Sequence, residues 1–172
     1  GVKAAAFLAL VRFYYMIAGA MGWDLAPALW AVAALTMLLG TVVGVVQRDV
    51  KRMLAYSAIA HAGFMLIGIL AYSKAAISAL SFYALTYGIA TVGAFGIIAL
   101  VRSNRDGSVG GEDGDLEAFK GLGRRSPWAA GAMTVFLLSF AGVPLTAGFM
   151  AKFRLFATGL SGTGTPFVIL AV

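Results

Sequence analysis

The stretch that decides the fold lies between Leu138 and Phe153 and reads LSFAGVPLTAGFMAKF. It sits inside an apolar run from Pro127 to Leu160. As one straight helix, at about 1.5 Å per residue, that run would reach roughly 50 Å, whereas the hydrocarbon core of a membrane is about 30 Å thick. Pro144 lies within the run, and proline breaks helices. The stretch therefore predicts two half-helices interrupted between Gly142 and Gly148.

A single lysine, Lys152, follows the predicted break, and no acidic residue lies within 30 positions of it on either side. A lysine at membrane depth costs a few kcal/mol, so such residues usually mark ion pathways or proton relays. Burial penalises the charged form, which allows a lysine to release its proton near neutral pH. We therefore predict that Lys152 carries protons; the alternative is a structural ion pair with another chain.

The composition is that of an integral membrane protein. Of 172 residues, 61% are hydrophobic and only 12% are charged. The chain has no cysteine and one histidine, so it offers no disulfide, iron–sulfur or strong metal site, and we expect no cofactor. The net charge of +6 is not read as nucleic-acid binding, because the basic residues sit in loops beside apolar spans. Both ends lie in apolar sequence, so we expect residues 1–172 to be a single membrane domain from a longer chain.

The predicted fold class is an all-α membrane bundle of several spans with one broken helix. A span needs about 20 apolar residues. Five such spans can be drawn, and Pro166 opens a sixth. They cover Gly1–Gly19, Ala28–Val46, Val50–Tyr72, Ala75–Val101 and Pro127–Leu160.

The loop charges predict the orientation of these spans. Eight basic residues fall in the loop Gln47–Arg52 and in the linker 102–126, which lie on one side if the spans alternate. The other side carries only Lys74 in its loops. Basic loops remain in the cytoplasm, so both segments are predicted to face it, with the protein in the cell (inner) membrane.

Two further titratable side chains are predicted near the middle of the membrane. Tyr14 and Tyr15 resemble the aromatic belt found at a membrane interface. Lys3 lies eleven residues, or about 17 Å of helix, from Tyr14, which places it near the middle of the membrane. It is either a proton carrier or a lysine that reaches out to water. His61 lies about eleven residues into the third span, and its unperturbed pKa of about 6.5 suits proton exchange. The alternative for His61 is a neutral histidine that bonds two helices.

Three hydroxyl side chains share one face of the predicted fourth span. Tyr83, Thr86 and Tyr87 are spaced at i, i+3 and i+4. They either hold water in a proton relay or bond neighbouring helices. Arg12, by contrast, lies beside the aromatic belt and is predicted to reach out to the interface.

Two motifs resemble the antiporter-like membrane subunits of respiratory complex I, the NADH-quinone oxidoreductase. The segment Gln47–Phe64, QRDVKRMLAYSAIAHAGF, is similar to the family signature Q-x-(D/N)-x-K-R-x-L-(A/G)-Y-S-S-I-x-H-x-G-(Y/F), with Ala58 in place of the second serine. Leu138–Phe153 resembles the family's broken twelfth helix. Lysine at position 152 and the segment Leu116–Pro127 are similar to N-type members, since M-type members usually carry glutamate at that lysine.

The resemblance implies helices eight to twelve, and the start of thirteen, of a proton-translocating subunit without a redox centre. Lys3, His61 and Lys152 would match three stations of the family's hydrated polar axis. Implied partners are the M-type antiporter-like subunit, the small K- and J-type subunits and the lipid bilayer. Two alternatives remain open: a subunit of a multi-subunit cation/proton antiporter or membrane-bound hydrogenase, and a membrane scaffold whose polar residues only join helices.

Overall fold

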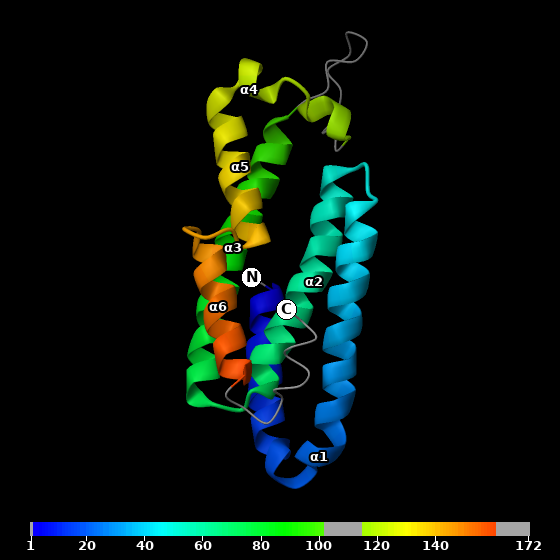
Figure 1. Ribbon diagram of the computed structural model, residues 1–172, viewed down its shortest axis with the longest axis vertical. Helices are drawn as coiled ribbons and strands as arrows, with labels where there is room; N and C mark the ends of the chain where they lie inside the picture. Colours follow the sequence, from blue (N-terminus) through cyan, green and yellow to red (C-terminus); the bar gives the residue numbers. More distant parts are fainter. Residues whose placement is uncertain (1, 102–114, 161–172) are drawn as a thin grey trace.

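The computed structural model describes residues 2–101 and 115–160, and all of its long elements are helices. The helices pack roughly parallel to one long axis (Figure 1). Their bounds are α1 Val2–Val45, α2 Val50–Leu70, α3 Lys74–Leu100, the 3-10 turn η2 Leu116–Phe119, α4 Leu122–Arg125, α5 Pro127–Ala141 and α6 Ala147–Leu160. The prediction of an all-α membrane bundle is confirmed. The predicted sixth span, from Pro166, lies outside the described residues.

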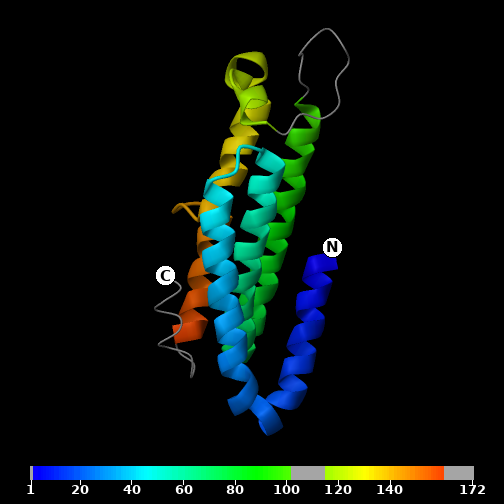
Figure 2. The same cartoon turned by 90° about the vertical axis from the view of Figure 1, so that its right-hand side faces the viewer.

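Three stretches are long and apolar enough to cross a membrane: Leu25–Val45, Val50–Leu70 and Lys74–Leu100. The last two agree with the predicted third and fourth spans to within two residues. The predicted first and second spans are both part of α1, which is helical throughout and contains Pro27. Figures 1 and 2 show α1 folding back on itself, so that it still supplies two arms, with the shorter apolar stretch Ala5–Ala20 in the first.

Local sequence explains where α2 and α3 begin. The side chain of Asp49 accepts a hydrogen bond from the Arg52 backbone N–H at 2.9 Å. Ser73 does the same for the N–H of Ala76 at 3.1 Å. Each is an N-cap that satisfies a backbone donor which the helix itself leaves free. The two caps fix where the helices that carry His61 and the tyrosines begin.

The predicted break is confirmed: α5 ends at Ala141 and α6 begins at Ala147, with five residues between them. Gly142 has a φ of 78°, the left-handed conformation that glycine adopts readily. Its N–H donates to the carbonyls of Leu138 and Ser139, and the N–H of Val143 also donates to Leu138. This Schellman-type ending satisfies two of the last carbonyls of α5.

The start of α6 is also satisfied within the protein. The hydroxyl of Thr146 accepts from the N–H of Phe149 at 3.3 Å, and the hydroxyl of Ser139 accepts from the N–H of Gly148 at 3.2 Å. Unwound backbone in a membrane persists only where protein or water bonds its polar groups. The start of α6 therefore has its backbone donors satisfied by one side chain of α5, Ser139, and one side chain of the break itself, Thr146.

Leu145 is the strained residue of the break. Its φ is 80°, a conformation that disfavours residues with a Cβ, and its side chain is completely exposed. Such a conformation costs on the order of 1–3 kcal/mol and persists only where the surrounding structure imposes it. Here Thr146 imposes it, because its N–H and its hydroxyl both donate to the carbonyl of Val143.

Two apolar clusters hold the bundle together, one toward each end. One joins the N-terminal part of α2 to α3 and α5, around Leu54, Ile98 and Met133. The other joins α1, the C-terminal part of α2, α3 and α6, and includes Ile67 and Leu155. The middle of the bundle lies between these clusters, at the level of the helix break.

The two predicted basic segments meet at the same end of the bundle. The N–H of Leu116 donates to the carbonyl of Arg48 at 3.0 Å, and Asp49 pairs with Asp115 in an isolated β-bridge. Arg125 closes the connector by donating to the carbonyl of Ala118 at 2.7 Å. Residues 102–114 of the predicted linker lie outside the described part of the chain.

Gly148 is the point of closest approach between α6 and α5, and it provides a test of the break. A Cβ at this position would overlap the backbone carbonyl of Ser139, whereas a Cβ at Gly131 in α5 would meet nothing within 4 Å. We predict that Gly148→Ala destabilises the assembled protein by about 1–3 kcal/mol, because rigid backbone has to move.

Gly131→Ala is the matched control and should be neutral or slightly stabilising, because alanine favours a helix by about 1 kcal/mol over glycine. Thermal unfolding of both variants in detergent measures the difference. Equal unfolding midpoints for the two variants would show that α5 and α6 are not in tight contact at Gly148.

Candidate proton-transfer site

The polar side chains predicted from three spans meet at the level of the helix break. They surround a cavity of about 10 Å³, which is close to the smallest space that holds one water molecule. The cavity is lined by residues of α2, α3, α5 and α6. They are His61, Tyr83, Thr86, Tyr87, Ala90, Ser139, Phe140, Gly148, Ala151 and Lys152.

Lys152 reaches back from α6 to the end of α5. Its Nζ donates to the carbonyl of Phe140 at 2.7 Å and to the carbonyl of Ala141 at 3.2 Å. These are the last two carbonyls of α5, and the negative end of a helix dipole attracts a cation. The ammonium also lies 5.1 Å from the centre of the Phe64 ring, close enough for a cation–π contact.

Lys152 is therefore held by neutral groups. In residues 2–101 and 115–160 the structure pairs it with no acid, as the acid-free sequence around it predicts. A charge-assisted bond to a carbonyl is stronger than a neutral bond, yet it lacks the full opposing charge of an ion pair. The break supplies both the bend that admits the side chain and the acceptors that hold it.

His61 is buried, with 5% of its surface exposed, in the middle of α2. Its Nδ1 is hydrogen-bonded to the hydroxyl of Tyr83 on α3. The ring of Tyr87 lies 4.6 Å away, between ring centres, and the ring of Phe140 lies 5.7 Å away. The bond joins α2 to α3 through Nδ1, and the tautomer of the ring decides which of the two groups donates.

Two aromatic residues connect the histidine to the lysine. The ring of Phe64 lies 5.8 Å from that of His61 and also beneath the ammonium of Lys152. Phe140 contacts His61 through its ring and Lys152 through its carbonyl. His61 and Lys152 thus share neighbours from two different helices, and both line the small cavity.

The predicted hydroxyl face of α3 points into the site. Tyr83 is 2% exposed, and Tyr87 is half-buried beside it. Thr86 also lines the cavity, and its hydroxyl donates to the carbonyl of Phe82 one turn back at 2.9 Å. That bond uses its proton, so the oxygen of Thr86 is left able to accept from water.

Two other basic residues of the sequence lie in the first arm of α1. The backbone of Lys3 is helical, and Figure 1 places the start of α1 at about the height of the break. The side chain of Lys3 lies outside the described part of the structure, so its predicted role stays a prediction. Arg12 is exposed, as expected for a side chain that reaches the interface.

Three contributors to the site were not predicted. Ser139 caps α6, Phe140 presents its carbonyl, and Phe64 lies under the ammonium. Ser139 carries a visible signal, since it is the polar residue at the end of an apolar run just before the break. Phe64 and Phe140 carry none, because a phenylalanine in a span is usually ordinary packing.

The fold and the site together define a class of membrane protein. The sequence model of the family described as "NADH:quinone oxidoreductase/Mrp antiporter, TM" matches residues 2–172. The chain belongs to this family.

Individual relatives agree with the N-type resemblance. The chain is 52% identical over 171 residues to NADH-quinone oxidoreductase subunit N of Beutenbergia cavernae, covering 99% of this chain and 32% of that protein. It is 49% identical over 170 residues to the subunit N of Mycobacterium tuberculosis, with 99% and 32% covered. The chain thus spans about a third of the length of the curated relatives it matches.

Two solved structures share the fold. Respiratory complex I from Thermus thermophilus matches with a TM-score of 0.72 and 36% identity, covering 84% of this chain and 31% of the matched chain. The membrane-bound sulfane sulfur reductase, an archaeal respiratory membrane complex, matches with a TM-score of 0.83 and 27% identity, covering 97% and 34%. The same arrangement of helices therefore occurs inside two respiratory membrane complexes.

The bond between Tyr83 and His61 predicts a stability effect. Tyr83→Phe keeps the ring but removes the hydroxyl, so buried Nδ1 loses its Tyr83 partner. We expect a loss of about 0.5–1.5 kcal/mol, the net contribution of a typical hydrogen bond within a protein. Tyr56→Phe, at a half-buried tyrosine of the same helix as His61, is the control. Thermal unfolding compares the two; an unchanged midpoint for Tyr83→Phe would contradict the bond.

Proposed function

We propose that this chain is part of a proton-translocating subunit of the membrane arm of a NADH-quinone oxidoreductase. Protons move along a row of buried bases, hydroxyls and water that includes Lys3, His61 and Lys152, with Tyr83 and Tyr87 as hydroxyl stations. Quinone reduction takes place elsewhere in the complex and drives this movement. The observation that carries the proposal is the position of Lys152, a base at the level of the break held by two backbone carbonyls and the ring of Phe64.

The geometry supports proton transfer in two ways. First, Lys152 and His61 line one cavity with room for about one water molecule. Such a water molecule would carry a proton between the two side chains without a movement of the helices. Second, Lys152 is bonded to dipoles and a ring instead of a carboxylate. An ion pair with a carboxylate would hold the lysine in its charged form, whereas dipoles leave it free to exchange its proton.

A second candidate function is proton movement in a different respiratory or antiporter complex. The higher TM-score, 0.83, belongs to the sulfane sulfur reductase, which keeps the same fold in an archaeal complex. The identity of 52% to a subunit N, against 27% for the reductase chain, favours the quinone oxidoreductase. Both candidates assign the same role to Lys152 and differ in the complex to which the chain belongs.

Partners and orientation follow from the same proposal. The family resemblance supports contacts with an M-type antiporter-like subunit and with the small K- and J-type subunits. The basic segments at one end of the bundle, around Arg48 and Arg125, face the cytoplasm by the positive-inside rule. The chain then lies in the cell (inner) membrane with Lys74 at the opposite surface.

Lys152→Ala tests the function directly. It removes the proton carrier but keeps Gly142 and Thr146, and so the helix break. In the assembled complex we expect proton pumping to fall by about tenfold or more, as for loss of a proton-transfer group. Quinone reductase activity should fall with it, because the two are coupled. Lys152→Arg should also be impaired, since arginine keeps its proton.

The matched control is Lys120→Ala, which removes an exposed lysine paired with Glu117 at the surface. It should leave pumping unchanged, because exposed ion pairs contribute about 0–1 kcal/mol. Pumping is measured by dye quenching in reconstituted vesicles. Full pumping by Lys152→Ala, with normal assembly, would refute the role of Lys152 and leave the scaffold interpretation.

Sidedness has its own test. Gly123 in α4 is exposed and has open space for a side chain, and the chain contains no cysteine. We expect Gly123→Cys to react with a membrane-impermeant maleimide in inverted vesicles and to be protected in intact cells or spheroplasts. Ready labelling from outside the cell would reverse the proposed orientation.

A further inference from the structure

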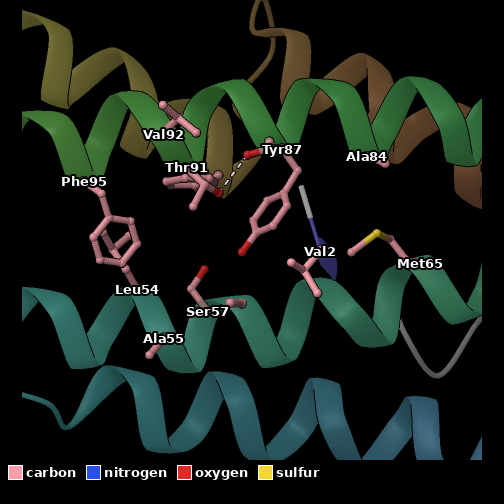
Figure 3. A pocket seen from close by; sticks show the side chains of 13 residues that line it. Val2, Leu54, Ala55, Ser57, Met65, Ala84, Tyr87, Thr91, Val92 and Phe95 are labelled. Carbon is pink, nitrogen blue, oxygen red and sulfur yellow. Dashed lines mark hydrogen bonds between the residues drawn. The ribbon is translucent and has the colours of Figure 1, made fainter. Parts of the chain in front are cut away.

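The two sides of α3 face different surroundings. Figure 3 shows the ring of Tyr87 pointing from α3 toward α2, on the side of the proton-transfer site. At about 3.6 residues per turn, the residues of the opposite side form one stripe along the helix. All of them are exposed, and they are Lys74, Ser78, Ser81, Phe82, Leu85, Ile89 and Val92. This stripe takes no part in the site described above.

An open groove of about 550 Å³ follows the stripe. Its floor on α3 begins at Ser81 and ends at Val92, and Leu8 on the first arm of α1 contributes a wall. Ser81 is the polar end, because the other lining residues are apolar. The eleven residues between the two ends span about 17 Å of helix. One half of the hydrocarbon core is about 15 Å thick, so the groove has the length of a lipid acyl chain.

Arg154 lies at the polar end of the groove. It projects from α6 and is exposed, and its guanidinium lies 5.6 Å from the centre of the Phe82 ring, within the range of a cation–π contact. Phe82 directly follows Ser81 on α3. Within residues 2–101 and 115–160 the structure pairs Arg154 with no carboxylate. Its planar guanidinium is therefore available to an anion from outside the described chain.

Two more cations lie toward the same end of the bundle. Lys74 is exposed at the start of α3, about two helical turns before Ser81. Arg12 is exposed and follows Leu8 by four residues, so both lie on the same side of α1. Figure 1 shows the first arm of α1 running toward the end at which α3 begins. The acidic side chains that the structure describes belong to the segments at the other end, and they are Asp49, Asp115 and Glu117.

We propose that this groove binds an anionic phospholipid from the leaflet at that end of the bundle. The phosphate lies among Arg12, Lys74 and Arg154, whose long side chains extend from apolar surface toward the headgroups. One acyl chain lies along α3 over Leu85 and Ile89. The order of polar end and apolar groove favours a lipid, because a carboxylate of a neighbouring protein would match the cations but not the groove. The positive charge selects anionic lipids over zwitterionic ones.

The test is photo-cross-linking in the assembled complex, in vesicles made of equal parts of phosphatidylglycerol and phosphatidylethanolamine. The photoreactive amino acid benzoylphenylalanine replaces Leu85, which is 62% exposed on the floor of the groove. Mass spectrometry then identifies the molecule attached to the peptide that contains this position. We expect a phospholipid adduct in which phosphatidylglycerol exceeds phosphatidylethanolamine by about fivefold or more, the effect of one basic residue on an anionic lipid.

Arg154→Gln, combined with the same photoreactive residue, removes the charge but keeps a polar side chain. We expect it to lower the ratio of phosphatidylglycerol to phosphatidylethanolamine in the adduct by about fivefold. Arg48→Gln is the matched control, since it removes an exposed arginine at the opposite end, and it should leave the ratio unchanged. If Arg154→Gln does not assemble, Arg12→Gln carries the same expectation.

Three results would overturn the proposal. An adduct with a protein segment would show that protein covers this side of α3. An adduct that contains the two lipids in equal amounts would show that the groove does not select charge. A ratio that stays the same when the arginine is replaced would show that the cations do not hold the headgroup. All of these readings concern lipid, so the pumping of Lys152→Ala still decides the proposed function separately.

Discussion

The rest of the structure depends on how backbone hydrogen bonds are satisfied where the fifth predicted span is broken. A helix that ends in a membrane leaves carbonyls without partners, at a cost of several kcal/mol each. Here the last four carbonyls of α5 are all used. Leu138 and Ser139 accept from the backbone of the break, and Phe140 and Ala141 accept from Lys152. The break therefore provides the acceptors for Lys152, and Lys152 takes the two carbonyls that the backbone of the break does not.

This dependence gives Lys152 two properties that a proton carrier requires. Its charged form is stabilised inside the bundle, because carbonyl dipoles and the Phe64 ring face the ammonium. Its charge is not cancelled by an acid in the described part of the chain, so a change in a neighbouring charge or in hydration alters the balance between its two forms. The nearby pair of His61 and Tyr83 supplies a second titratable group within the same cavity wall.

Much of the fold could be predicted because membrane helices follow simple rules. The spans were visible as apolar runs, and Pro144 with its flanking glycines marked the break. The basic residues placed two segments at one end, and Leu116 does bond to Arg48 there. The boundary between the first two spans was less visible, since α1 remains helical through its turn and through Pro27. Proline signals the end of a helix only in part, because context can accommodate it.

The candidate site was predicted in its titratable residues but not in its contacts. Charge and depth identified Lys152 and His61, and helical spacing identified Tyr83 and Tyr87. The acceptors of Lys152 are backbone atoms of Phe140 and Ala141, and a sequence does not show which carbonyls a fold leaves free.

The most direct test of the central claim is to observe the protonation state of Lys152 itself. Solid-state nitrogen NMR of the assembled complex, labelled on lysine Nζ, distinguishes an ammonium from an amine. The signal of Lys152 is identified by its absence in Lys152→Gln. The account predicts that this signal shifts from the ammonium to the amine position when the complex goes from the resting state to NADH-driven turnover. An ammonium signal that is the same in both states would contradict the role of Lys152 as a proton carrier.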